Sequence, residues 1–312
     1  MELSVLLLRK ILSMALMMLM GFAVVKIGAV KKGQTGVLSS LTLYIICPCM
    51  ILSAFQLEWS SERAAGLLLA ALAAVFLHVL YIALTAVLKK CAKLDRIEQA
   101  SLIYSNGGNL IVPLVGATIG EEYVFYCCAF LAVQTILIWT HLPRLLVPEN
   151  AKKGGLKKIL LNPNMISIAV GFLFFVCRIT FPSIIGDTID SVGGMIGPAA
   201  MLMIGMLMAE VDMKGVCRSW KSWLVVGGRL VLYPLLLTLC FALSGVTRMF
   251  PWAKGVLLVT SLAACAPIAV SVTQMADISG LDSKKASALN VLSVILCIVT
   301  MPAMIAVYQL IC

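Results

Sequence analysis

Two asparagines, Asn106 and Asn109, lie three residues apart in the middle of an apolar stretch, together with a glycine pair at 107–108 and with Pro113. Amide side chains donate and accept hydrogen bonds, so these two could bind a carboxylate or orient a cation or a water molecule. The proline lacks an N–H, and its ring clashes with the carbonyl four residues earlier, which is that of Asn109. Glycines weaken the same turn. We therefore expect the helix to break or kink here, with the two amides on one helical face beside the break. The predicted site in this half of the chain consists of Asn106, Gly107, Gly108, Asn109 and Pro113.

A second polar and proline-interrupted stretch lies in the other half, at residues 261–274. If two broken helices cross, four half-helix ends meet at the middle of the membrane. The N-terminal ends carry free N–H groups and the positive end of the helix dipole, which suits a carboxylate. The alternative is that the polar groups only satisfy the unwound backbone. The predicted site in this half consists of Ala266, Pro267, Ile268, Ser271 and Gln274.

Isolated polar side chains inside other apolar stretches are further candidates. Arg229 lies about seven residues into its stretch, roughly 10 Å from the inner end. An ionisable group at that depth is a functional candidate, either for the substrate or for coupling, unless it snorkels to the interface. His78 could carry a proton or be a hydrogen-bonded packing residue. Gln134 lies in the middle of its stretch, and His141 lies near the inner end of the same stretch.

These elements belong to a membrane protein. Of the 312 residues, 62% are hydrophobic and only 12% are charged, which indicates an all-α polytopic protein embedded in a lipid bilayer. The net charge of +10 does not indicate nucleic-acid binding, because the basic residues lie in short loops, where they set topology. The chain lacks a phosphate-binding loop and metal-ligand spacing, so we expect neither an enzyme nor a resident cofactor.

Ten stretches of about 20 residues are each long enough to cross about 30 Å of hydrocarbon. The predicted spans 1 to 10 lie at residues 3–25, 37–57, 64–88, 98–119, 123–147, 163–182, 190–209, 222–247, 254–276 and 286–311. Most of the 24 Lys and Arg residues fall in the loops after the odd-numbered spans. This bias predicts that those loops are cytoplasmic and that both termini are extracytoplasmic, in the cell membrane.

The longest loop, residues 148–162, divides the chain into a first repeat at 1–147 and a second at 163–312, with five spans each. An odd number of spans in each half requires the halves to be inverted relative to one another. Prolines support a repeat, because Pro48 and Pro198 lie in spans 2 and 7, and Pro113 and Pro267 lie in spans 4 and 9, at nearly equal separations. We expect two inverted five-helix repeats with crossed, broken spans 4 and 9.

These motifs together resemble the auxin efflux carrier family of permeases, over nearly the whole chain. Span 2 is similar to the family's second helix, which has an aromatic residue followed by proline. The family's N-x-G-x-x-x-x-P crossover resembles residues 104–114, although Val112 stands where the family often has glycine. Further similar segments are Asn162-Pro163, Gly197-Pro198, 264–276, 280–282 and 293–302.

The resemblance implies a fold similar to sodium/proton antiporters and bile-acid transporters. It also implies a scaffold of spans 1, 2, 6 and 7, a moving domain of spans 3–5 and 8–10, an elevator motion and a homodimer joined through the scaffold. Implied substrates are small organic anions, either auxin-like monocarboxylates or dicarboxylates such as malate and malonate. A coupling ion, H⁺ or Na⁺, and uniport both remain open. The alternative function is a membrane ligand sensor that uses the same site without net transport, and a channel is a third hypothesis.

Overall fold

The computed structural model describes residues 2–31, 34–146, 156–211 and 213–312. These residues form helices joined by loops, and they contain no strand beyond one isolated antiparallel bridge. Seven helices are long and apolar enough to cross a membrane, and three shorter apolar helices lie at Gly107–Thr118, Pro163–Cys177 and Ala253–Ala264. The protein is therefore an all-helical, multi-pass membrane protein.

The helices follow the predicted spans closely. The first half contains α1 (Glu2–Lys26), α2 (Thr35–Leu41), α3 (Cys47–Ala54), α4 (Ser61–Ala92), α5 (Arg96–Ile103), α6 (Val112–Thr118) and α7 (Val124–Leu146). The second half contains α8 (Leu156–Leu160), α9 (Pro163–Cys177), α10 (Ser183–Gly193), α11 (Ile196–Glu210), α12 (Lys214–Arg218), α13 (Trp220–Gly227), α14 (Tyr233–Ser244), α15 (Ala253–Ala264), α16 (Val270–Ile278) and α17 (Ser283–Ile311). Short 3₁₀ turns lie at Glu121–Tyr123 and Val246–Arg248. Of the predicted linker 148–162, residues 148–155 lie outside the described residues.

Three π-helical turns each end two residues before a proline. They lie at Thr42–Ile46, Gly107–Ile111 and Gly228–Leu232, before Pro48, Pro113 and Pro234. A proline removes one N–H and crowds the preceding turn, and a wider turn accommodates both effects without ending the helix. The chain does not break at Pro113, because the helix is continuous from Gly107 to Thr118, with a widened turn before the proline.

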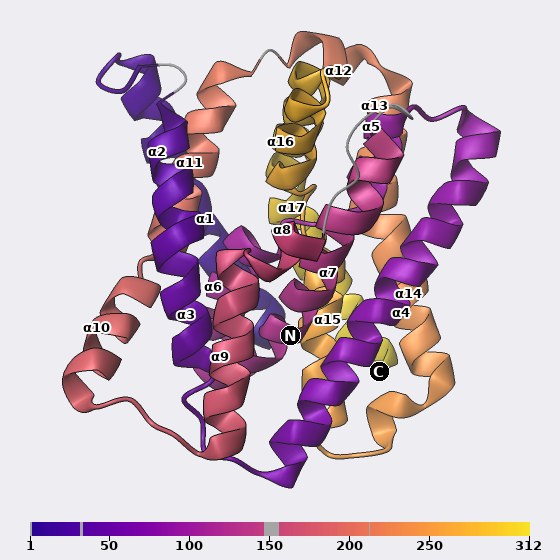
Figure 1. Cartoon of the computed structure of the whole chain (residues 1–312). Coiled ribbons are helices and arrows are strands. Elements are labelled where there is room, and N and C mark those ends of the chain that lie inside the picture. The colour runs from indigo at the N-terminus through magenta and orange to yellow at the C-terminus, as the bar shows by residue number, and fades with distance from the viewer. Residues whose placement is uncertain (1, 32–33, 147–155, 212) are drawn as a thin grey trace.

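Close packing of α1 along α11 depends on two glycines (Figure 1). A Cβ atom at Gly21 would lie 2.2 Å from the main-chain oxygen of Leu202, and one at Gly205 would lie 1.9 Å from that of Met18. The two helix backbones are thus in direct contact, each through a glycine of one helix and the main chain of the other. Elsewhere α3 packs on α9 and α10, α4 packs on α7 and α15, and α17 packs on α16.

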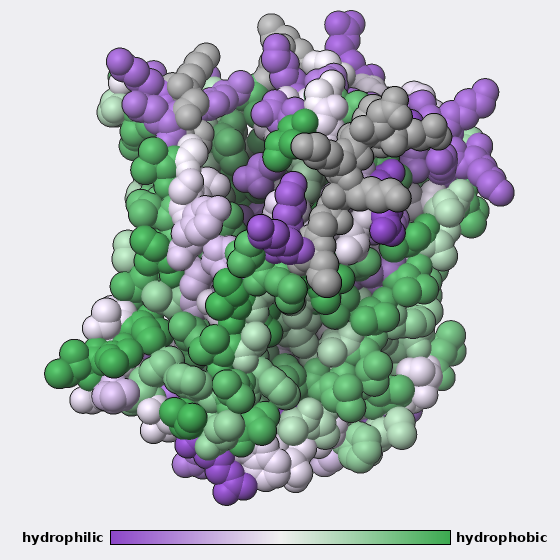
Figure 2. Space-filling model, in the orientation of Figure 1, coloured by the Kyte–Doolittle hydropathy of each residue, from purple (hydrophilic) through white to green (hydrophobic). Residues whose placement is uncertain are grey.

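The surface divides into an apolar body and a hydrophilic end. Figure 2 shows hydrophilic residues gathered at one end of the molecule, over a broad hydrophobic surface. In Figure 1 this end contains α12 and the beginnings of α5 and α13, whereas α17 ends in the opposite half. Basic residues in these elements include Arg96, Arg218 and Lys221. The apolar body has the character expected of a lipid-facing surface.

Candidate functional site

The helical chain is interrupted at two places that lie side by side in the core. After α5 ends at Ile103, residues 104–106 leave the helix, with Tyr104 in an extended conformation. After α15 ends, residues 265–269 lead into α16. The N–H of Asn106 donates to the carbonyl of Pro267 at 2.8 Å, and the N–H of Ala269 donates to the carbonyl of Tyr104 at 3.1 Å. The two broken helices therefore cross at their breaks, as the sequence predicts.

In the middle of each interrupted segment, the main-chain groups form hydrogen bonds with side chains of the helix that follows. Gln134 of α7 accepts hydrogen bonds from the N–H and the hydroxyl of Ser105, at 3.2 and 3.1 Å, and donates to the Ser105 carbonyl at 2.9 Å. The Ile268 N–H donates to Ser293 of α17 at 3.0 Å, and the Asn290 amide donates to the Ile268 carbonyl. Freed main-chain groups at membrane depth require such partners.

Sequence reasoning identified Gln134 as polar and mid-span, but it missed the roles of Ser105, Asn290 and Ser293. A signal for the last two was present, since Asn290 and Ser293 lie three residues apart in the otherwise apolar stretch 288–299 and so share a helical face. Their partners are the main-chain N–H and carbonyl of Ile268. Because Ile268 is an apolar residue, the sequence did not indicate that it would need polar partners. Gln134, Asn290 and Ser293 therefore hydrogen-bond the unwound main chain.

The C-terminal ends of α5 and α15 share one cation. Arg229 is fully buried, and its guanidinium donates to the carbonyls of Ala266 at 3.1 Å and of Leu102 and Ala263 at 3.3 Å each. The guanidinium carbon also lies 5.2 Å from the centre of the Tyr81 ring, a cation–π distance. The snorkelling alternative is wrong, because the charged group is in the core and not at the interface.

The N-terminal ends of the same crossing begin at Gly107 and at Val270. The first N–H groups of any helix lack intrahelical partners and lie at the positive end of its dipole. Beside them, Asn106 is 4% exposed, and its side-chain nitrogen is buried without a hydrogen-bond partner. A buried and unsatisfied donor directly before one helix N-terminus, in a segment that is hydrogen-bonded to the residues leading into the other, is an arrangement that can bind an anionic oxygen.

The other predicted site residues divide between this crossing and its surroundings. Gly108, Asn109, Pro113 and Ser271 are partly buried, and Pro267, Ala266 and Ile268 are buried within the crossing. Asn106 has a φ of −81° and a ψ of 59°, outside the helical region, so it shares no helical face with Asn109 as the sequence argument assumed. Gln274 is exposed on α16, one turn beyond Ser271.

Comparison with known families decides the class. The family model described as membrane transport protein matches residues 6–305. The chain belongs to this membrane transport protein family. This confirms the predicted auxin efflux carrier family. Members of the family are transporters and not enzymes. A search of the curated proteins found no match.

Two histidines of this membrane transport protein lie on either side of Tyr104. His78 is buried, and its Nδ1 donates to the Ala74 carbonyl at 2.7 Å while its ring stacks on Phe130. The Tyr104 hydroxyl lies 2.7 Å from Nδ1 of His141. The rings of His78 and His141 both pack near the ring of Tyr104. The Tyr104 carbonyl accepts the crossing hydrogen bond from Ala269, so both histidines lie beside the segment that forms the site. The structure thus gives both histidines a packing role at the crossing.

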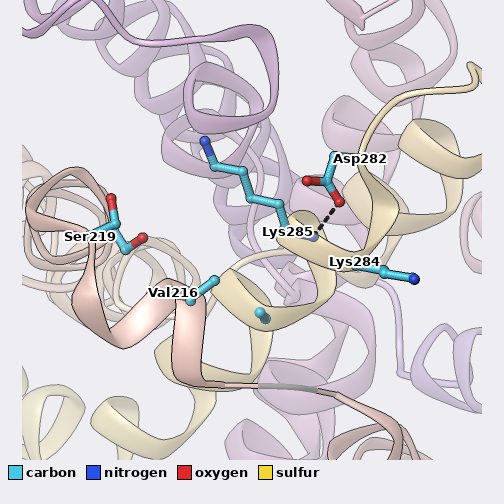
Figure 3. A pocket seen from close by; sticks show the side chains of 8 residues that line it. Val216, Ser219, Asp282, Lys284 and Lys285 are labelled. Carbon is cyan, nitrogen blue, oxygen red and sulfur yellow. Dashed lines mark hydrogen bonds between the residues drawn. The ribbon is translucent and has the colours of Figure 1, made fainter.

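A cavity of about 450 Å³ opens at the hydrophilic end of the transporter, between α12 and the start of α17. Figure 3 shows Val216 and Ser219 on one side and the first turn of α17, which begins after Asp282, on the other. Lys285 in that turn forms ion pairs with Asp95 at 2.5 Å and with Glu98 at 2.7 Å. These ion pairs join the first turns of α5 and α17. Among the described residues, no group of His, Cys, Asp and Glu side chains could hold a metal ion.

Proposed function

We propose that this transporter carries small organic anions, and that their carboxylate binds at the helix N-termini beside Asn106. The proposal rests on a difference in charge and hydrogen bonding between the two sides of the crossing. The C-terminal ends have a resident cation in Arg229, whereas the N-terminal ends have a buried amide donor without a partner. One carboxylate would complete that side, because its oxygens accept several N–H donors at once.

We further propose ten spans in two inverted repeats. The seven long helices coincide with predicted spans 1, 2, 3, 5, 7, 8 and 10, and the three shorter ones coincide with spans 4, 6 and 9. The anchoring pattern also supports a repeat, because span 5 supplies Gln134 to the break in span 4, and span 10 supplies Asn290 and Ser293 to the break in span 9. Equivalent spans would therefore have equivalent roles.

An elevator motion of spans 3–5 and 8–10 against a scaffold of spans 1, 2, 6 and 7 is part of the proposal. It is supported by the close packing within each group, α1 on α11 in one and α4 on α7 and α15 in the other. Where the groups meet, a Cβ at Gly197 of α11 would lie 3.2 Å from Cβ of Pro113. We propose a homodimer through the scaffold, in the cell membrane, with the hydrophilic end in the cytoplasm.

Purified transporter in liposomes tests the function. At 100 mV, moving one charge across the membrane corresponds to about 2.3 kcal/mol. We expect labelled monocarboxylates and dicarboxylates to move toward the positive side under an imposed potential, with no sodium or proton gradient. Saturable binding without flux would instead indicate a sensor, and single-channel currents would indicate a channel. A strict need for an ion gradient when a potential is present would contradict potential-driven transport.

Asn106→Ala is expected to weaken substrate binding by roughly 10- to 150-fold, the loss of one hydrogen bond to a charged group. The variant should fold, because the side-chain nitrogen of Asn106 has no hydrogen-bond partner that would be lost. Asn109→Ala, at a partly exposed position, is the companion variant with a smaller expected effect. Dissociation constants from thermal shifts at matched protein concentration measure both. Parent-like affinity of both variants would place the substrate elsewhere.

A further inference from the structure

Arg229 has an unusual set of partners for a buried charge. All three of its hydrogen bonds go to main-chain carbonyls, and none goes to a carboxylate. The two ion pairs of Lys285 lie at the hydrophilic end and do not involve Arg229. A buried cation without a counter-charge is strongly unfavourable. Something other than an acidic side chain must therefore stabilise it.

The helix ends supply that stabilisation. Leu102 lies in the last turn of α5, Ala263 lies in the last turn of α15, and Ala266 lies just beyond it. The C-terminal end of a helix carries about half a negative charge, so the two ends together correspond to about one. One guanidinium neutralises them and donates to the carbonyls of Leu102 and Ala266, and it is a second donor to the carbonyl of Ala263, which also accepts the N–H of Ala266. The charge and the geometry of the pair of ends both match a single cation.

The remaining sides of the guanidinium are closed. The Tyr81 ring lies beside it, and Tyr233 packs edge-on against Tyr81 at 4.9 Å between ring centres. Tyr233 in turn is hydrogen-bonded to Thr85 at 3.0 Å. Tyr81 of α4 thus packs against the cation, and Tyr233 of α14 packs against Tyr81. A diffusible cation could not share the position with Arg229.

We propose that Arg229 is a resident counter-ion at the place where a cation-coupled carrier would bind its coupling cation. It follows that this protein requires neither sodium nor another metal cation at the crossing. That consequence for transport rests on the proposed function, whereas the consequence for stability does not. Removing the side chain would leave converging main-chain carbonyls, which are suitable ligands for a monovalent cation or for guanidinium.

The test compares melting temperatures of purified full-length variants in detergent. The buffer contains N-methylglucamine, 150 mM sodium or 10 mM guanidinium. For Arg229→Ala we expect a melting temperature roughly 5–15 °C below the parent in N-methylglucamine. Guanidinium should recover at least half of that loss. The matched control is Leu230→Ala, which opens a cavity at the adjacent buried residue without removing the cation. Guanidinium should not raise its melting temperature.

Equal effects of guanidinium on both variants, or no effect on Arg229→Ala, would overturn the proposal. If Arg229→Ala does not fold, the proposal is tested on the parent protein. Its melting temperature should change by less than about 2 °C between N-methylglucamine and sodium, and its flux by less than twofold. Stabilisation of the parent by sodium, or sodium-dependent flux, would overturn the proposal. Absence of any carboxylate flux would refute the proposed function alone, because the melting temperatures need no substrate.

Discussion

Gly205→Ala is expected to lower the melting temperature of the protein by roughly 6–12 °C, the equivalent of about 3 kcal/mol at a tightly packed site. The reason is the 1.9 Å separation between an added Cβ and the Met18 main-chain oxygen. A flexible side chain could move away, but the obstacle here is helix backbone, so α1 and α11 would have to separate along their whole contact. Thermal unfolding followed by size-exclusion chromatography measures the effect.

Gly227→Ala is the matched control for this prediction. Gly227 also lies in a helix, but nothing is within 4 Å of the position that its Cβ would take. Alanine is the better helix former by up to about 1 kcal/mol, so the control should be neutral or slightly stabilising. Equal unfolding temperatures of Gly205→Ala and Gly227→Ala would contradict direct contact between the backbones of α1 and α11.

Gln134→Leu is expected to abolish transport and to destabilise the protein by roughly 3–6 kcal/mol. Leucine has a similar size but leaves the N–H, the hydroxyl and the carbonyl of Ser105 without their partner. Each unsatisfied buried polar group costs about 1–3 kcal/mol. Flux and melting temperature of the purified variant, measured on the same preparation, check both parts.

Two variants accompany Gln134→Leu. Asn290→Leu removes the equivalent partner of the Ile268 carbonyl and should also abolish transport. Thr140→Val is the control on α7, because the Thr140 hydroxyl only donates to the Ile136 carbonyl of its own helix. A parent-like Gln134→Leu would show that the Ser105 segment holds its conformation without the amide.

Sequence predicted the membrane class and the helices well, because length and apolarity alone determine what can cross a bilayer. The sequence misplaced the first break, because a proline excludes one helical hydrogen bond but does not determine whether the helix then breaks, bends or widens. At Pro113 the helix widens, whereas the actual break at Tyr104–Asn106 depends on Gln134 and on Pro267, both far away in sequence. The hydrophobic periodicity of the sequence likewise could not determine whether the Arg229 guanidinium would contact water or main-chain carbonyls. Its partners lie on three other segments.

The paired extended segments have a consequence for the synthesis of the protein. Ser105 and Ile268 form a bridge between positions about 160 residues apart. At about 5–20 residues per second, the ribosome needs roughly 10–30 s to supply the second segment after the first. During that time the helices of the first half lie in the membrane with the crossing hydrogen bonds of Tyr104 and Asn106 unmade. The nascent chain must therefore protect these main-chain groups with Gln134, water or the insertion machinery until the second half arrives.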